Sequence, residues 1–221
     1  AVLPGQVAHR ATGASAAAPT ATPVRETRQT GALPRLIAIG ASTGGTEALC
    51  RIMERMPATS PPVAIVQHMP EGFTEAFARR LDALSPMQIS EARDGARLGP
   101  GQAVVAPGNR HLAITGGASF VACRLEDGDL VNRHRPAVDV LFHSVARLLK
   151  GDAVGVILTG MGDDGTRGLS AMREAGAYTI GQDEATSVVY GMPKAARLAG
   201  AVVQEAPLDR IASAILTRVA T

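Results

Sequence analysis

Short, uninterrupted apolar runs that alternate with amphipathic segments constrain the fold of this chain more than any other feature. Three of the runs are LIAIG at 36–40, VAIVQ at 63–67 and AVGVILTG at 153–160. A strand that is covered on both faces has this pattern, because neither of its faces meets water. Segments with helical spacing follow the first two, TEALCRIMERM at 46–56 and FTEAFARRLDAL at 73–84. The alternation predicts an α/β fold, doubly wound, with a mostly parallel sheet and helices on both faces.

The middle of the chain, from residue 111 to residue 132, has a different pattern. Apolar and polar residues alternate there, and Gly-Gly and Asp-Gly pairs mark turns. These signals are typical of antiparallel hairpins, so we expect an antiparallel hairpin insertion. Helical spacing returns at 138–149 and 208–219, and Gly176 and Pro193 are placed to end one helix and to begin another.

The first 34 residues differ in composition from the rest of the chain. Ala, Thr and Pro dominate, and no apolar period persists. Such a segment cannot bury enough surface to offset the entropy that is lost on ordering it. We therefore expect a flexible linker at 1–34 and one folded domain at 35–221. Because the chain begins with Ala, we also expect that something upstream of it is missing.

Charge and cysteine content narrow the class of protein. A formal net charge of +2 gives no bulk electrostatic argument for nucleic-acid binding. The sequence contains neither an apolar run long enough to span a membrane nor a signal-peptide pattern at its start. Its two cysteines, Cys50 and Cys123, provide neither a disulfide framework nor a zinc motif. We expect a cytoplasmic domain that does not insert into a membrane.

Three of the predicted strands end in residues that can carry chemistry. Ser42 lies in GASTGG after the first strand, and His68 directly follows the second. Asp163 and Asp164 follow the later strand in TGMGDDG. Ligands of an open parallel sheet bind beyond the carboxyl ends of its strands, so these side chains fall on one rim. A serine, a histidine and an aspartate that meet in space are the parts of a nucleophilic triad.

The glycine-rich stretch around Ser42 has three interpretations. It fits the G-x-S-x-G pattern, in which a sharp strand-to-helix turn presents a reactive hydroxyl. It also fits a tight turn in which Ser42 hydrogen-bonds only to backbone, or a loop that cradles the phosphate of a nucleotide. Against phosphate, the stretch lacks a Walker lysine, and Ser42 replaces the second glycine of G-x-G-x-x-G.

The other two positions also have alternatives. His134, in the polar stretch VNRHRPAVD, is the main competitor of His68. Arg133 and Arg135 beside it would either hold a carboxylate-rich partner or form a solvated charge cluster. The residues alone do not rank Asp163 against Asp164, and one of the two could cap a helix. We expect no metal, because no His or Glu lies near them at ligand spacing.

Several longer motifs together resemble one family. In chain order they are LIAIGASTGG, QHMPEGFTEAFARRL, VAPGNRHL, VNRHRPAVDVLFHSVA, AVGVILTGMGDDG and YGMP. They look like the catalytic domain of the chemotaxis protein-glutamate methylesterase CheB, from about Leu36 to the last predicted helix. The resemblance implies a doubly wound α/β enzyme, without a cofactor, that hydrolyses methyl esters of receptor glutamates. Many members of the family also deamidate receptor glutamines.

The resemblance also implies roles for individual residues. Ser42 resembles the family nucleophile, His68 its base, and Asp164 the carboxylate that orients the base. Thr43 and Met161 lie beside these residues in the sequence, and we expect their backbone N–H groups to stabilise the oxyanion.

The implied partners are the methylated cytoplasmic helices of chemoreceptors, whose acidic surface Arg133 and Arg135 would steer. The family pattern also includes an N-terminal receiver domain, which this chain lacks, so we expect an isolated catalytic fragment. The rival within the same family pattern is a regulatory scaffold without chemistry. A missing triad residue would favour that rival, and none is missing here.

Overall fold

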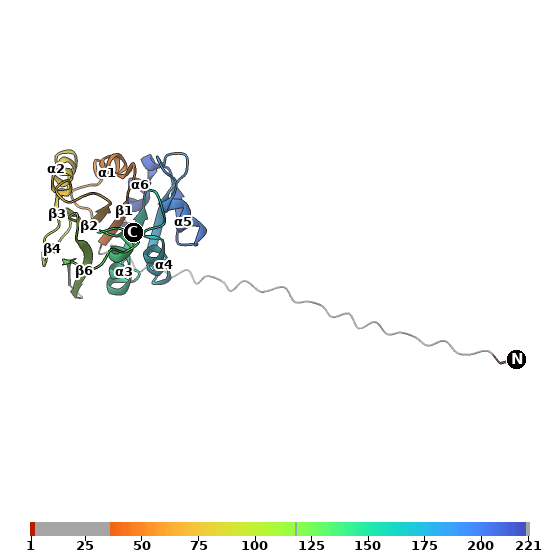
Figure 1. The fold of residues 1–221 in the computed structure, drawn as a ribbon. Helices are drawn as coiled ribbons and strands as arrows, with labels where there is room; N and C mark the ends of the chain where they lie inside the picture. Colours follow the sequence, from red (N-terminus) through yellow and green to blue (C-terminus); the bar gives the residue numbers. More distant parts are fainter. Residues whose placement is uncertain (3–35, 118, 220–221) are drawn as a thin grey trace.

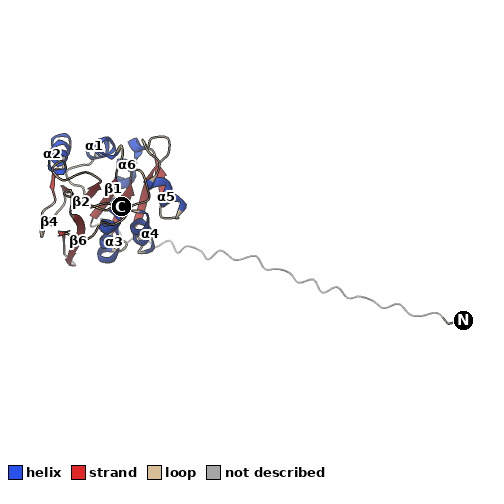
Figure 2. Cartoon of the chain, in the orientation of Figure 1, coloured by secondary structure: helices blue, strands red, loops and turns tan. Residues whose placement is uncertain are grey.

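The computed structural model describes residues 1–2, 36–117 and 119–219, so the linker predicted at 1–34 lies outside the described residues except for its first two. Seven strands form the main sheet, in the order β10-β9-β8-β1-β2-β5-β3, and every pairing in it is parallel. Figure 2 shows the strands of this sheet between two sets of helices. The strands are β1 (Leu36–Ala41), β2 (Val63–Gln67), β3 (Gln88–Glu91), β5 (Gln102–Val105), β8 (Ala153–Ile157), β9 (Tyr178–Gln182) and β10 (Gln204–Ala206).

Helices cover both faces of the sheet, as predicted (Figure 1). One face packs against α1 (Gly45–Met53), α2 (Thr74–Leu84) and α6 (Leu208–Val219). The other packs against α3 (Val138–Leu149), α4 (Thr166–Glu174) and α5 (Met192–Leu198). The second face also carries a small antiparallel sheet, in the order β4-β7-β6, made of β4 (Arg97–Leu98), β7 (Phe120–Glu126) and β6 (His111–Gly117).

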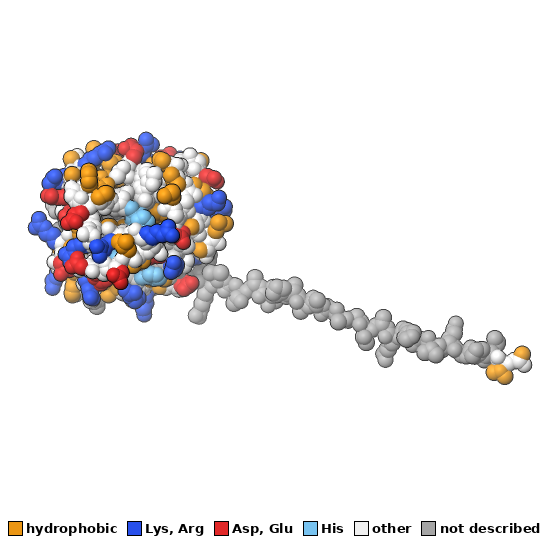
Figure 3. All heavy atoms as spheres, in the orientation of Figure 1, with side chains coloured by type: hydrophobic (Ala, Val, Ile, Leu, Met, Phe, Trp, Pro, Cys, Tyr) orange, Lys and Arg blue, Asp and Glu red, His pale blue; other side chains and the backbone are white. Residues whose placement is uncertain are grey.

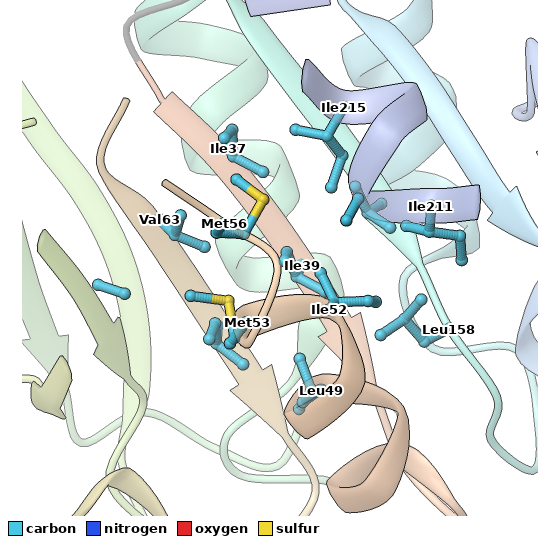
Figure 4. Packing of buried hydrophobic residues seen from close by; sticks show 14 of the residues in the cluster. Ile37, Ile39, Leu49, Ile52, Met53, Met56, Val63, Leu158, Ile211 and Ile215 are labelled. Carbon is cyan, nitrogen blue, oxygen red and sulfur yellow. The ribbon is translucent and has the colours of Figure 1, made fainter. Parts of the chain in front are cut away.

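The central strands alternate between two separate cores, which explains why they read as continuous apolar runs. In β1, Ile37 and Ile39 pack toward α1 and α6, and Figure 4 shows both among their neighbours. Leu36 and Ala38, on the opposite face of the same strand, pack toward α3. All four are fully buried. Burial on this scale contributes about 25 cal/mol per Å² of apolar surface, so the central strands form a rigid base for the loops at their ends.

The antiparallel insertion differs in part from the prediction. The Gly-Gly signal does join a hairpin, β6 and β7, but a third strand, β4, pairs with β7 from the other side. The Asp-Gly signal does not produce a second hairpin, because Val131 pairs only with His134 in an isolated bridge within the described residues. The prediction also missed β10, whose three residues are too few to show a period.

The chain order places a crevice at the middle of the sheet. After β1 the chain passes to α1 on one face, and after the neighbouring strand β8 it passes to α4 on the opposite face. The carboxyl ends of β1 and β8 therefore flank a topological switch point, where ligands bind in open α/β sheets.

Candidate active site

The three side chains predicted to form a triad come from three adjacent strands. Ser42 directly follows β1, His68 directly follows β2, and Asp164 lies in the loop between β8 and α4. Because the order in the sheet is β8-β1-β2, the serine stands between the other two at the carboxyl rim. The loops that carry the three residues therefore follow neighbouring strands at one rim of the sheet.

The turn that carries Ser42 is held through its backbone. The Ser42 N–H donates to the carbonyl oxygen of Thr159 at 3.0 Å, and the Ser42 carbonyl accepts from the N–H of Gly45 at 2.8 Å. The amide Nε2 of Gln67 donates to the same carbonyl at 2.9 Å. A Cβ at Gly160 would lie 2.8 Å from the Cβ of Ser42, so only glycine lets the β1 and β8 loops approach this closely.

His68 and Asp164 form a direct and buried pair. The ring Nε2 lies 2.7 Å from Oδ2 of the carboxylate, although the two residues are 96 positions apart in the sequence. Their side chains are only 7% and 1% exposed. The other ring nitrogen, Nδ1, is buried and has no hydrogen-bond partner among the described residues. When Nε2 carries the proton and donates it to the carboxylate, Nδ1 is left as the basic atom.

In the structure, no hydrogen bond joins the Ser42 hydroxyl to His68 within the described part of the chain. Catalytic hydrogen bonds are often long before substrate binds and shorten in the complex. The arrangement of the ring is the reverse of that in chymotrypsin-like triads, where Nδ1 bonds the carboxylate and Nε2 serves the serine.

Asp164 has a full set of hydrogen-bond donors. Oδ2 accepts from His68 and from the N–H of Val138 at 2.6 Å, while Oδ1 accepts from Nδ2 of Asn132 at 2.7 Å and from the N–H of Asp139 at 3.2 Å. Val138 and Asp139 open α3, so the carboxylate also meets the positive end of that helix. Burial alone would raise the pKa of Asp164, but the bonds from His68, Asn132 and Val138 outweigh it and lower the pKa. The side chain is therefore ionised at neutral pH.

The structure also separates the two neighbouring aspartates. Asp164 is 1% exposed and bonded to His68, whereas Asp163 is exposed and touches no member of the triad through a hydrogen bond among the described residues. The capping role considered for one of them is absent, because the N-cap residue of α4 (Thr166–Glu174) is Gly165 and no side chain caps the helix.

His134, the competitor of His68, lies against it. The two rings stack with centroids 3.6 Å apart and planes inclined by 12°. Burial and the neighbouring His68 lower the pKa of His134, and Asp164 offsets part of this shift. His134 makes no ring hydrogen bond to Asp164, so it supports the face of the His68 ring while His68 alone bonds the carboxylate.

Thr43 and Met161 are the predicted oxyanion donors. Thr43 follows Ser42 and Met161 follows Gly160, the two residues at which the β1 and β8 loops approach each other. Their backbone N–H groups donate no hydrogen bond to any other described residue. The side chain of Met161 is 72% exposed. Free N–H groups beside a nucleophile are what an oxyanion site requires, so the assignment stays a prediction with its donors available.

Known proteins share the sequence pattern and the fold of this domain. The family model for CheB methylesterase matches residues 37–215. This chain belongs to the CheB methylesterase family. A protein-glutamate methylesterase/protein-glutamine glutaminase of Anaeromyxobacter dehalogenans is 56% identical over 181 residues, which cover 82% of this chain and 52% of the relative. A relative with the same type of name from Pseudomonas aeruginosa is 50% identical over 220 residues, which cover 99% of this chain and 61% of the relative.

The fold agrees with that of a solved member of the family. The crystal structure of the Thermotoga maritima CheB methylesterase catalytic domain matches with a TM-score of 0.81 and 38% sequence identity, covering 83% of this chain and 97% of that chain. This chain spans roughly half to three fifths of the length of the curated relatives it matches. The family and the doubly wound fold predicted from the sequence are thus confirmed.

The two arginines proposed to contact a receptor differ in this CheB-family chain. The guanidinium of Arg135 is already bonded within the protein, because it donates to Oδ1 of Asn109 and to the carbonyl oxygen of Gly128. Arg133 is exposed, and its guanidinium makes no hydrogen bond or ion pair with another described residue. Only Arg133 is therefore available to a partner without rearrangement of the loop.

A pocket of about 310 Å³ adjoins the candidate base. His68, His134 and the apolar side chains of Leu130 and Pro136 contribute to its wall, and Arg133 lies at it. Leu130 is 61% exposed. Figure 3 shows histidines among basic and apolar side chains on the face that it draws. The site is open and mixed in character, which suits a segment of another protein more than a small enclosed ligand.

The described part of the chain offers neither a metal site nor a membrane-spanning helix. It contains no group of three or more His, Cys, Asp or Glu side chains that could hold a metal ion. None of its helices combines the length and apolar character needed to cross a bilayer.

Sequence reasoning missed three polar residues that organise the site. Gln67 holds the nucleophile turn, while Asn132 and Asp139 lie behind Asp164. Asn132 and Asp139 lie in the polar stretch at 131–139, whose sequence interpretation rests on its charge, and Gln67 is the polar end of a predicted strand. Amide and carboxylate side chains that are buried in a functional loop would have been the better clue.

Proposed function

We propose that this CheB-family chain hydrolyses the γ-methyl esters of glutamate residues on chemoreceptor proteins, with Ser42, His68 and Asp164 as its triad. The observation that carries the proposal is the bond between His68 and Asp164 at the same rim as Ser42, in a chain whose relatives are named protein-glutamate methylesterases. A regulatory scaffold would have no need for a buried, ionised carboxylate aimed at an imidazole.

In the first step, the Ser42 hydroxyl attacks the ester carbonyl carbon and passes its proton to Nδ1 of His68. The new imidazolium keeps its Nε2 proton in the bond to Asp164, whose negative charge stabilises it. The N–H groups of Thr43 and Met161 stabilise the oxyanion. Collapse of the tetrahedral intermediate breaks the C–O bond, and methanol leaves with the proton from Nδ1.

In the second step, water attacks the acyl-serine. His68 accepts a proton from this water at Nδ1 and returns it to Ser42 as the acyl bond breaks, so the enzyme is restored and the receptor keeps a glutamate side chain with a free γ-carboxylate. The same steps on a glutamine side chain would release ammonia. We include deamidation in the proposal because the relatives are also named protein-glutamine glutaminases.

The proposed partners follow from the same reaction. The substrate segments are the cytoplasmic helices of receptors, which places this domain in the cytoplasm. We also propose an upstream receiver domain in the full-length protein, because the matched relatives extend well beyond the region that this chain covers. We propose that this receiver domain covers the active site until it is phosphorylated. Equal ester hydrolysis by this chain and by an unphosphorylated full-length protein would contradict that covering role.

Receptor membranes that carry labelled methyl esters test the proposal. The full chain is incubated with them, and volatile methanol is counted against the Ser42→Ala variant at the same concentration. We expect methanol release that depends on Ser42. Release no faster than with Ser42→Ala would overturn the proposed activity, and mass spectrometry of receptors with glutamine at the same sites tests deamidation separately.

A further inference from the structure

Behind the triad, a second buried carboxylate is tied to Asp164 by one amide. Asn132 donates from Nδ2 to Oδ1 of Asp164 at 2.7 Å and to Oδ2 of Asp139 at 2.8 Å. The two aspartates are 1% and 4% exposed. Asp139 in turn accepts from the N–H of Gly168 in α4 at 2.7 Å, so the network links the β8 loop, α3 and α4.

The Asn132 loop, residues 127–137, holds this amide in an unusual backbone conformation. Asn132 and Arg133 both have positive φ, 52° and 69°, a region that costs ordinary L-residues about 1 kcal/mol or more. The two sides of the loop are joined by His111, whose Nδ1 accepts from the N–H of Ala137 at 3.2 Å while Nε2 donates to the carbonyl oxygen of Asp129 at 2.8 Å. The loop is therefore braced around Asn132.

Two buried carboxylates that approach one another disfavour each other's ionised form. An amide with two N–H donors, one for each carboxylate, offsets this repulsion without adding charge. Asparagine is also among the few residues that tolerate the left-handed backbone region. The residue at position 132 thus meets both a backbone and a side-chain requirement.

The other charged groups around Asp164 do not replace the amide. His68 bonds Oδ2 from the β2 side, and His134 stacks on the far face of that ring. Arg167 of α4 reaches the carbonyl Oδ1 of Asn132 at 3.5 Å, so it contacts the amide and forms no salt bridge with the carboxylate among the described residues. Asn132 is therefore the one side chain besides His68 that donates to Asp164 within the described structure.

We propose that Asn132 is a positioning residue for the proposed esterase, holding Asp164 ionised and turned toward His68, with Asp139 as the anchor that fixes the amide. The proposal rests on the function proposed above. Asn132 touches neither substrate nor reacting atoms, and it acts through the orientation and charge of the carboxylate. Its loss weakens the support of the imidazolium that forms in each step, so kcat falls while KM stays near its original value.

Two substitutions at position 132 distinguish the effect of losing the amide from the effect of straining the backbone. Asn132→Gly removes the side chain but keeps the left-handed conformation without strain, whereas Asn132→Ala removes the side chain and strains the backbone. We expect both to lower kcat by roughly ten- to a hundredfold, the range for one hydrogen bond to a charged group. Asn132→Asp places a third carboxylate in the cluster and should lose more than either.

Arg110→Gln is the matched control. Arg110 anchors the start of the same loop by donating to Asp127 and to the carbonyl oxygen of Leu125, without touching either buried carboxylate. Its kcat should stay within about twofold of wild type, since an exposed ion pair contributes little. Near-normal kcat in Asn132→Gly, or an equal loss in Arg110→Gln, would overturn the proposal.

Ring-nitrogen NMR of His68 provides a readout that does not depend on turnover. When Asn132 is lost, Asp164 is held less firmly toward His68, so the hydrogen bond between Nε2 and the carboxylate should weaken. We expect the Nε2–H signal of His68, which reports the hydrogen bond to Asp164, to shift or broaden in Asn132→Gly and to stay in place in Arg110→Gln. An unchanged Nε2–H signal in Asn132→Gly overturns the positioning role even if wild type hydrolyses no methyl ester. Absence of ester hydrolysis by wild type would, by itself, contradict only the proposed function.

Discussion

The two sides of the candidate active site are built in different ways. On the nucleophile side, Ser42 is held by bonds to its backbone N–H and carbonyl, and its hydroxyl bonds no other residue that the structure describes. On the acid side, both oxygens of Asp164 accept two hydrogen bonds each in a nearly dry setting. The difference shows that the acid side of the site is ordered before substrate binds and that the nucleophile side is less constrained. The carboxylate is fixed before any substrate arrives, whereas the hydroxyl retains the freedom to meet a carbonyl carbon and then a leaving group.

The largest expected effect on kcat comes from substitution on the nucleophile side. Ser42→Ala should lower kcat by roughly 10⁴- to 10⁶-fold, as for nucleophiles of other triads. Because the hydroxyl supports no other described side chain, thermal unfolding should be nearly unchanged. Ester release by stopped assay and melting by calorimetry check the two halves of this statement. Near-normal turnover in Ser42→Ala would remove the serine from the mechanism.

The fixed side should respond in both activity and stability. Asp164→Asn should lower kcat about 10⁴-fold, because an amide that donates to Nε2 forces the ring proton onto Nδ1, where the base must be free. Loss of a buried, fully bonded carboxylate should also lower the free energy of unfolding by about 3 kcal/mol. Urea denaturation of this variant beside Ser42→Ala measures the contrast. Equal stability of the two variants would show that the two sides are not built differently.

Low pH should reduce the contribution that Asp164 makes to the free energy of unfolding. The pKa of Asp164 is lowered in the folded state, so its contribution to stability is present above the unfolded pKa and is lost as pH falls through the folded pKa. The difference in unfolding free energy between wild type and Asp164→Asn should therefore be largest near neutral pH and should shrink below about pH 4. Urea titrations at several pH values test this. A difference that stays constant down to acid pH would contradict the ionised state.

The smallest effect is expected at the rim. Arg133→Ala should raise KM for receptor membranes about two- to fivefold, in the range of one exposed charge, and should leave hydrolysis of a small ester unchanged. Arg135→Ala is the informative companion, because Arg135 bonds Asn109 and Gly128 and its loss should lower the melting temperature instead. Equal losses with the receptor and the small ester in Arg133→Ala would discredit steering.

The features that the sequence predicted are those with a local signature. The apolar runs predicted the central strands, and the position of a residue directly after a strand predicted the rim that carries Ser42 and His68. Gly176, with φ of 98°, lies just beyond the end of α4, and Pro193 opens α5, both as the patterns indicated.

The features that could not be predicted depend on contacts between distant residues. Asn132 donates to Asp164, which lies 32 positions later in the sequence. It also has a positive φ that the neighbouring residues do not predict. Arg135 looked available for a partner because its sequence neighbours are polar, but Asn109, 26 positions earlier, accepts from it. Short strands such as β4, with two residues, have no period to detect.

The orientation of the His68 imidazole determines which partner each of its two nitrogens can contact. Neighbouring strands lie about 4.8 Å apart, and the sheet order puts β1 next to β2 and β8 one place beyond. Nδ1 is the ring nitrogen nearer to the main chain, and Nε2 is the farther one. In the mechanism proposed here the near atom serves the adjoining strand, while the far atom bridges over it to the strand beyond. One planar ring thereby serves loops that follow three neighbouring strands, and a side chain with a single polar atom at that place could not serve both partners.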